Sequence, residues 1–526
     1  MLLLFLCEIS LNGKTHFYFP AKKNEMWFES TISHNEFLKK ESENASMLKE
    51  SEIKRFIDDD KTSEKKRIAN VGQRYLEGKH DILNYRLFYY DDDGILQEDK
   101  TRSNIKISHP FFQELTMQLS SYMLSGSENP IRAKDNTEGL QDYLDEYFDD
   151  EFWDEIGETI EGAYSKGFDY IYGFKGSDDR LHFQNADSIG VVEVRAKDTD
   201  DNCEYIIYWY IDRIDKGRKT VKKIQVWDKT QTTYFVQINN GKIIKDESAT
   251  INPRPHVLYT TEEGKKYGTG FGFIPFWRLD NNKKQISGLK VIKGIIDDYD
   301  LHSCSLSNNL VDFDHPLYAI SGYDGSDLNE LMQNLKTKKT VSVGSGGGLD
   351  IKTVDIPYEA RKSKLEMDEK NIYRFGMGLN TLGLKDTNAT TNIAIKMAYT
   401  LLDLKANKLE KRLKKLLKAI LKVVLAEINN KNGTDFTISD VNFKFTKEVM
   451  TNEKENIENK KINAETQTIL INNLLNAAAT IGDDEVLKGI CEILEINYEE
   501  IKSKLDKQKV DITVPAIDEG GDTISE

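Results

Sequence analysis

The segment GMGLNTLGLKDTNATTNIAIK, residues 376–396, is the most informative for predicting the fold, because it separates two stretches with strong helical patterning. It is rich in Gly, Thr and Asn, which favour turns and loops over helices. Upstream, residues 358–379 have the spacing of one helix, and downstream residues 392–428 carry the longest helical pattern in the chain. The pattern predicts a helix, a polar loop at 380–391 and a second, longer helix.

The longer helix is strongly basic on one side. Between residues 396 and 422 it has nine Lys or Arg and two acidic residues, a local net charge of +7. Its apolar residues form a stripe, which predicts a packed helix with a solvated basic face. A basic amphipathic helix can also bind a membrane or nucleic acid, and that alternative stays open here. The stripe consists of Leu401, Leu404, Leu409, Leu413, Leu416, Leu417, Ile420 and Val424.

The residues before 358 predict another helix and then several short elements. Apolar residues at helical spacing predict one helix over 284–312. A small helix near 326–335 and two short strands, around 341–343 and 351–354, follow it. The glycines at 344–348 lie between these strands and lack the Lys-Ser/Thr that completes a phosphate-binding loop. They therefore predict a hairpin tip.

A mixed α/β region precedes these helices. Runs of β-branched and aromatic residues at 204–214, 222–228 and 232–238, separated by turn residues, predict antiparallel strands. The stretch YYDDDGIL (89–96) predicts a hairpin, because it lacks the sixth-position Gly and distal Glu of a calcium loop. Residues 105–124 have helical spacing.

Residues 138–161 contain eleven Asp or Glu and no Lys or Arg. Tyr143, Tyr147 and Phe148 lie among them at helical spacing. This pattern predicts a helix with a solvated acidic face, and a contact for a basic partner surface is the alternative. Carboxylates without a histidine, a nucleophile or a glycine-rich loop beside them are poor evidence for catalysis.

The composition limits the class of protein. The chain has 526 residues, a net charge of −16 and 39% hydrophobic residues, which argues against binding of nucleic acid over the whole surface. The four cysteines have no metal-binding spacing, and no apolar run is long enough to cross a membrane. Since no nucleotide-binding, hydrolase or metalloprotease motif is present, we expect no enzyme, no cofactor and no metal site.

The two ends of the chain have different patterns. The apolar start, MLLLFLCEIS, has no preceding basic region and no cleavage site, so it predicts a buried strand or docking segment rather than a signal peptide. Residues 450–506 have further helical patterns. The acidic residues 507–526 are expected to be a disordered tail.

Three blocks in this order resemble the portal proteins of tailed bacteriophages. They are residues 59–82 (DDKTSEKKRIANVGQRYLEGKHDI), 274–300 (IPFWRLDNNKKQISGLKVIKGIIDDYD) and 371–413 (NIYRFGMGLNTLGLKDTNATTNIAIKMAYTLLDLKANKLEKRL). Together with the order of elements, the resemblance covers about residues 50–480. None of these blocks is a catalytic signature, and the resemblance depends on their order along the chain.

The resemblance implies an α+β, mainly helical fold with portal-like architecture. Its parts are a mixed α/β wing, a two-helix stem, a small α/β clip, a long helix behind a tunnel loop and a helical crown. On this chain they are the N-terminal segment of unclear role (1–50), wing (51–283), first stem helix (284–312), clip (313–357), second stem helix (358–379), tunnel loop (380–391), long helix with return to the wing (392–449), crown (450–506) and tail (507–526).

The resemblance also implies a function and partners. Portal proteins form a homo-oligomeric ring, usually a dodecamer, at one capsid vertex of the virion, and are assembled in the host cytoplasm. Double-stranded DNA passes through the ring during packaging and ejection. The implied partners are the terminase motor, the scaffold and major capsid proteins, and the head-completion (adaptor) proteins, without a membrane.

Two groups of residues are expected to carry these contacts. The tunnel loop would face DNA through small polar residues with permissive backbones and one lysine offset by an aspartate. The glycine-rich tip of the clip would dock partners. The tunnel-loop residues are Asn380, Thr381, Gly383, Lys385, Asp386, Thr387, Asn388 and Thr390. The clip-tip residues are Gly344, Ser345, Gly346, Gly347 and Gly348.

Three alternatives remain at the level of sequence. The segment 380–391 could be a plain connector between two helices. The chain could be an enzymatic subunit, a nuclease or ATPase, of the packaging machinery. It could also be a membrane-active or helix-binding module that uses residues 396–425.

Overall fold

A computed structural model gives a mixed α/β chain that divides into two compact units. The first comprises Met1–Thr381 and Ala398–Glu448, and the second Leu382–Met397 and Val449–Glu526. The structure describes residues 9–11, 14–16, 32–33, 48–126, 128–135, 137, 139–176, 178–195, 203–215, 219–260, 266–313, 317–322, 327–333, 337, 345–352, 356–380, 392–448, 453–494 and 496–510.

The first unit begins with short strands and three helical segments. Strands β1 and β2 form an antiparallel pair, so part of the apolar N-terminal region is indeed extended, whereas residues 1–8 lie outside the described chain. Strand β3 pairs with β16. The bounds are β1 (Ile9–Leu11), β2 (Lys14–His16), β3 (Ile32–Ser33), β16 (Lys266–Thr269), α2 (Glu50–Thr62), α3 (Glu64–Leu76) and the 3-10 turn η1 (Asp81–Asn84).

The predicted hairpin at 89–96 and the predicted helix within 105–124 are confirmed. Strands β4 (Phe88–Tyr90) and β5 (Leu96–Glu98) pair antiparallel, and α4 spans Phe111–Met123. The Asp91 carboxylate accepts hydrogen bonds from the backbone N–H of Ile95 (2.8 Å) and the side chain of Gln97 (3.1 Å), which closes the turn.

The acidic segment forms two helices, not one. Helices α5 (Leu140–Tyr147) and α6 (Asp150–Lys166) are separated because Asp149 caps α6, its carboxylate accepting from the N–H of Phe152 at 2.9 Å. Phe148 is buried at the break. The carboxylates of both helices lie mostly at the surface, as the solvated acidic face requires.

Two sheets pack through an aromatic core, and the three strands predicted within 204–238 are confirmed. One sheet has the order β17-β7-β8 and the other β13-β12-β11-β10-β9, with β14 on the edge of β12. The bounds are β7 (Phe168–Lys175), β8 (Leu181–Ala186), β9 (Val191–Val194), β10 (Tyr205–Asp215), β11 (Lys219–Trp227), β12 (Gln231–Ile238), β13 (Ile243–Lys245), β14 (Arg254–Pro255), β15 (Val257–Thr260) and β17 (Phe276–Asp280).

Each face of the larger sheet has its own core. On one face, Ile53 and Ile57 of α2 pack against Ile207, Ile224 and Phe235. On the other face, aromatic side chains of the smaller sheet fill the interior with Trp227, as in the stacked pair of Tyr172 and Phe276 at 5.1 Å. The alternation of side chains along each strand directs one set of residues to each core.

The helix predicted over 284–312 is shorter than expected. Helix α7 spans Lys293–Asp312 and follows the 3-10 turn η2 (Gly288–Val291), so residues 284–292 are not part of the α-helix. The Asn282 side chain accepts from the N–H of Ile286 (3.1 Å), and Gln285 has a φ of 56°. This local turn overrides the apolar spacing.

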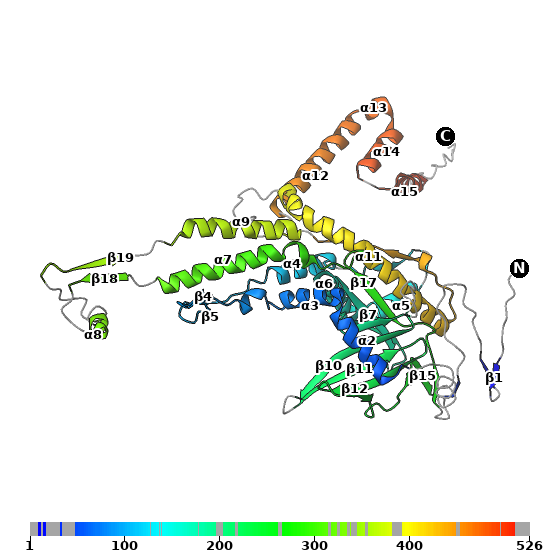
Figure 1. Ribbon diagram of the computed structural model, residues 1–526. Coiled ribbons are helices and arrows are strands. Elements are labelled where there is room, and N and C mark those ends of the chain that lie inside the picture. The colour runs from blue at the N-terminus through cyan, green and yellow to red at the C-terminus, as the bar shows by residue number, and fades with distance from the viewer. Residues whose placement is uncertain are drawn as a thin grey trace, which may run out of the picture. The chain divides into compact units, whose positions relative to one another are not determined.

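Helix α9 (Tyr358–Gly376) lies beside α7 and confirms the predicted helix that ends before 380 (Figure 1). The elements between them are β18 (Leu317–Ser321), α8 (Leu328–Gln333) and β19 (Gly348–Lys352). The predicted small helix and the strand at 351 are present. The described partner of β19 is β18, and the predicted strand at 341–343 lies outside the described residues.

A buried carboxylate fixes α7 to the rest of the first unit. Asp300 is fully buried and receives hydrogen bonds from Nδ1 of His80 (2.6 Å), and from Nδ1 (2.7 Å) and the backbone N–H (3.0 Å) of His109. His80 is also fully buried and stacks on Tyr75. These hydrogen bonds hold the pKa of Asp300 below its ordinary value, although burial opposes them.

The long helix and the C-terminal helices complete the chain. Helix α11 spans Asn392–Asn432, four residues beyond the predicted end. Strand β20 (Val441–Phe443) pairs with β6 (Ile131–Ala133) and so belongs to the first unit. The remaining elements are η4 (Ile438–Asp440), α12 (Glu453–Asn476), α13 (Ala478–Ile481), α14 (Asp483–Ile493) and α15 (Tyr498–Val510).

The second unit has a small core of its own. Leu474 of α12 lies against Gly489 of α14, and Cys491 and Val486 of α14 are buried. Residues 507–510, predicted as the start of a disordered tail, instead form the end of α15, so that part of the prediction is wrong. Residues 511–526 of the predicted tail lie outside the described residues.

Replacing Asp300 with Ala should lower the free energy of unfolding by about 3 kcal/mol, because it leaves His80 buried without its acceptor. Asp300→Asn keeps a hydrogen-bond acceptor and should lower the free energy of unfolding by less. As a control, Asp59→Ala at an exposed position of α2 should change the free energy of unfolding by no more than about 0.5 kcal/mol. Thermal unfolding of the three variants measures this, and equal midpoints for Asp300→Ala and Asp59→Ala would contradict it.

Candidate functional site at the base of the 380–391 loop

The loop predicted at 380–391 begins at a well-defined turn. Met377 ends α9 with a φ of 54°, and the N–H of Gly378 donates to the carbonyl of Tyr373 at 2.9 Å. This left-handed residue stops the helix and redirects the chain. Of the predicted tunnel-loop residues, the structure describes Asn380, whose side chain donates to Glu369 at 3.4 Å. Thr381, Gly383, Lys385, Asp386, Thr387, Asn388 and Thr390 lie outside the described residues.

A side chain of helix α4 holds the start of the loop through hydrogen bonds to the loop's backbone. The Gln118 side chain accepts from the N–H of Leu379 at 2.9 Å and donates to its carbonyl at 3.0 Å. Gly378 lies directly against the fully buried Leu115, where a Cβ would overlap the leucine side chain. Glycine is therefore needed at 378 for close packing.

Helix α11 holds the same turn from another direction. The Lys405 ammonium donates to the carbonyl of Gly376 at 3.0 Å and lies 4.7 Å from the ring centre of Tyr164 on α6. Burial lowers the pKa of Lys405 to about 7. Four helices, α4, α6, α9 and α11, thus converge where the loop begins.

Buried polar contacts fix α11 along its length. Tyr122 of α4 donates to Asp403 at 2.6 Å, and Tyr147 of α5 donates to Glu427 at 2.8 Å. Lys175 of β7 pairs with the same Glu427 at 3.2 Å. These contacts fix α11 at Asp403 and Glu427, and both points lie within the first unit.

The predicted apolar stripe of α11 is mostly correct. Leu409, Leu413, Leu416, Leu417, Ile420 and Val424 are buried. Leu401 and Leu404 are not: they are 37% and 56% exposed. On the outer side, five exposed lysines recur every three or four residues, as expected for a solvated basic face. They are Lys408, Lys411, Lys415, Lys418 and Lys422.

The predicted clip tip lies at a two-stranded sheet. Ser345, Gly346 and Gly347 precede β19 and are described, whereas Gly344 is not. Gly348 begins β19, and its N–H donates to Oγ of Ser321 at 3.1 Å. Gly346 has a φ of 85°, a conformation that favours glycine.

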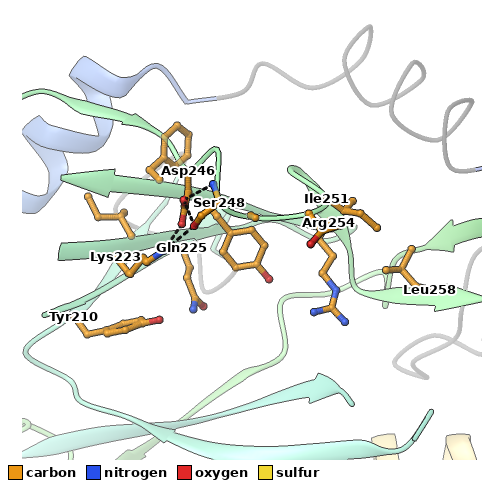
Figure 2. A pocket seen from close by; sticks show the side chains of 13 residues that line it. Tyr210, Lys223, Gln225, Asp246, Ser248, Ile251, Arg254 and Leu258 are labelled. Atoms are coloured by element: carbon orange, nitrogen blue, oxygen red, sulfur yellow. Dashed lines mark hydrogen bonds and ion pairs between the residues drawn. The ribbon is translucent and has the colours of Figure 1, made fainter. Parts of the chain in front are cut away.

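A cavity of about 430 Å³ opens on the larger sheet (Figure 2). Lys223 is paired with Asp246, and Oγ of Ser248 donates to the same carboxylate at 2.6 Å. The Asp246 carboxylate thus engages both the lysine and the serine at this cavity. Across the described ranges, no three His, Cys, Asp or Glu side chains are grouped so that they could hold a metal ion.

None of the helices in the described part of the chain is long and apolar enough to cross a bilayer. Six of the eight residues in the apolar stripe of α11 are buried, and polar contacts join the helix to α4, α5 and β7. Its apolar face is therefore largely occupied within the first unit.

The sequence did not indicate Gln118 or Lys405. Gln118 is a polar residue within an apolar helix, and Lys405 is one of nine basic residues in its segment. Gln118 donates to a backbone carbonyl 261 residues away and Lys405 to one 29 residues away. No local sequence pattern therefore distinguishes these two residues from their neighbours.

Comparisons with known proteins identify relatives of the chain among phage portal proteins. The chain is 25% identical over 341 residues to the portal protein of Bacillus phage SPP1, an alignment that covers 65% of this chain and 66% of that protein. It is 37% identical over 145 residues to the portal protein of Clostridium phage phiCD119, covering 27% of this chain and 32% of that protein. The chain thus spans just under two thirds of the length of the first of these relatives.

The family described as phage portal protein, SPP1 Gp6-like, matches residues 54–487. This range runs from within α2 to within α14, and it includes the base of the loop and the whole of α11. The chain therefore belongs to the SPP1 Gp6-like family of phage portal proteins.

Proposed function

We propose that copies of this chain form a ring, a dodecamer, at one vertex of a phage capsid, and that double-stranded DNA passes through it during packaging and ejection. Membership of the portal family over residues 54–487 is the observation that carries this proposal. Phage portal proteins are components of the virion. Assembly in the host cytoplasm is part of the proposal.

The proposed parts follow the element order. Residues 51–283 are assigned to the wing, 313–357 to the clip and 450–506 to the crown. The two stem helices are α7 and α9, with the first stem helix beginning at Lys293 and not at 284. The side-by-side packing of α7 and α9 supports this assignment.

The tunnel-loop role of 380–391 is supported by the base of the loop. A segment that touches a moving polyanion needs weak, equivalent contacts on a fixed support. The segment supplies one lysine, Lys385, next to Asp386 and several small polar residues. The support is the turn held by Gln118 and Lys405.

The proposed partners are assigned by position. The clip tip, Gly344–Gly348, would dock the terminase motor during packaging and the head-completion proteins afterwards. The scaffold and major capsid proteins would contact the outside of the ring. We propose no catalytic role, no cofactor and no membrane partner.

Electron-microscope class averages of the purified chain test the ring directly. A ring with a central hole and uniform subunit number is the expected result, and a 60.3 kDa monomer at micromolar concentration would overturn the proposal. DNA cleavage or ATP turnover lost on replacing a single carboxylate would favour an enzymatic subunit. Co-sedimentation with liposomes that depends on residues 396–425 would favour a membrane-active module.

Loop chemistry should affect DNA movement more than stability. Lys385→Ala should change the free energy of unfolding by no more than about 0.5 kcal/mol, and Gly383→Val should allow rings but slow packaging. The contrasting variant is Gln118→Leu, which removes two hydrogen bonds at the loop base. It should lower the free energy of unfolding by about 2 kcal/mol.

Ring yield and packaged DNA, measured for the same three variants, make the comparison. If Gly383→Val destroys the rings while packaging per surviving ring is normal, residues 380–391 are a connector. If Gln118→Leu is as stable as the wild type, the contacts of Gln118 do not hold the loop base.

Deleting residues 344–348 should leave ring assembly intact and abolish attachment of the packaging motor. The reason is that this glycine-rich tip contributes no buried apolar side chain. Analytical ultracentrifugation measures the rings, and co-purification with the motor measures docking. Loss of the rings after this deletion would show that the tip also makes contacts between subunits.

A further inference from the structure

The β4–β5 hairpin leaves an unusual amount of apolar surface uncovered. Its side chains Phe88, Tyr89, Tyr90, Ile95 and Leu96 are each between 48% and 73% exposed. An isolated two-stranded hairpin is marginally stable in water. Phe88, Tyr90 and Leu96, the cross-strand partner of Tyr90, share one face of the hairpin, and exposed apolar side chains gathered in this way mark an interaction surface.

The tip of this hairpin is acidic. Asp91 is used inside the turn, as described above, whereas Asp92 and Asp93 are exposed. Within the described part of the chain, no cation forms an ion pair with either of them. The hairpin therefore presents aromatic rings behind two unpaired carboxylates.

A complementary surface lies on α9. A hollow of about 370 Å³ is lined by Ser363, Glu366, Met367, Lys370, Asn371 and Arg374. Met367 is 52% exposed, and Lys370 and Arg374 have no ion pair among the described residues. The hollow thus combines one apolar side chain, Met367, with two cations and one carboxylate.

The hairpin and the hollow lie on different sides of the α7–α9 pair. The buried side of α9 carries Asp368, Ile372 and Gly376, and the hollow occupies the opposite side of that helix.

The segment that follows the hairpin runs along α7 on another side. There, the N–H of Ile105 donates to Asn308 at 2.7 Å and the N–H of Ile107 donates to Sγ of Cys304 at 3.2 Å. Figure 1 shows α7 between α9 and the hairpin.

We propose that the β4–β5 hairpin of one copy docks into the α9 hollow of the adjacent copy. This inference rests on the proposed ring, of which it names one contact. Asp92 and Asp93 of the hairpin lie near Lys370 and Arg374 of the neighbour. The Tyr90 ring, on the same face of the hairpin as its cross-strand partner Leu96, packs over these cations and against Met367.

The placement of the two surfaces gives the contact a direction. Each copy offers its hairpin on one side and its hollow on another, so the interface is heterologous. A heterologous interface joins copies head to tail and closes into a ring when the rotation fits. Within one copy, α7 separates the two surfaces, which leaves both free for neighbours.

Charge reversal tests the contact. Asp92→Lys/Asp93→Lys and Lys370→Glu/Arg374→Glu should each lower the assembled fraction about tenfold, and the two reversals combined should restore it. The matched controls Glu247→Lys/Asp435→Lys and Lys242→Glu/Lys245→Glu reverse exposed charges elsewhere in the first unit and should assemble normally. Sedimentation velocity at fixed concentration and salt measures the fraction, and circular dichroism checks folding.

The outcomes separate this contact from the ring itself. A wild-type chain that remains monomeric contradicts the proposed function, and this contact with it. If the wild-type chain forms rings and the charge reversals do not change the assembled fraction, only the proposed contact is overturned. If each reversal alone abolishes the rings and the combined variant does not restore them, the contact is also overturned. Direct pairing of these charges requires that the combination restores assembly.

A disulfide provides an independent readout. In a Cys7→Ser/Cys203→Ser background, where Cys304 and Cys491 are buried, Asp93→Cys combined with Lys370→Cys should give a ladder of covalent multimers on oxidation. Either cysteine substitution alone should give none. A ladder that stops at dimers excludes a head-to-tail contact, and wild-type-like rings without any cross-link overturn the proposal.

Discussion

The Asp300 carboxylate is the constraint on which the helical part of the first unit depends. It is fully buried and joins α7 to η1 through His80 and to the start of α4 through His109. Helix α9 packs on α7, and α4 holds the turn that follows α9. A buried charge tolerates one geometry, because loss of any partner leaves it unsatisfied. The relative positions of three helices therefore follow from one side chain.

Local patterns in the sequence predicted several elements correctly. Alternating β-branched and aromatic residues indicated β10, β11 and β12, and the spacing of leucines indicated α11. These patterns suffice because each element is decided by neighbours along the chain. The family resemblance rested on the order of three blocks, and the match over residues 54–487 agrees with it.

The remaining features depend on contacts between distant residues or on side chains that override a pattern. Asp149 divides the acidic segment by capping α6, and Asn282 forms a turn where the apolar spacing continues. Gln118 is bonded to a residue 261 positions away. Such contacts cannot be read from periodicity, since they arise only after the helices have packed. The DNA-facing residues stay a prediction, because Thr381 to Thr390 lie outside the described chain.

Lys405 makes the stability of the junction between α9 and the loop depend on pH. Because burial lowers the pKa of its amine from 10.5 to about 7, the folded chain binds fewer protons there than the unfolded chain between these values. The free energy of unfolding contributed by this site therefore rises with pH across that interval and is lowest, and constant, below it. The contact with the Gly376 carbonyl is thus proton-linked: its site contributes most to the free energy of unfolding once the amine is neutral, because the cost of burying a charge is then gone.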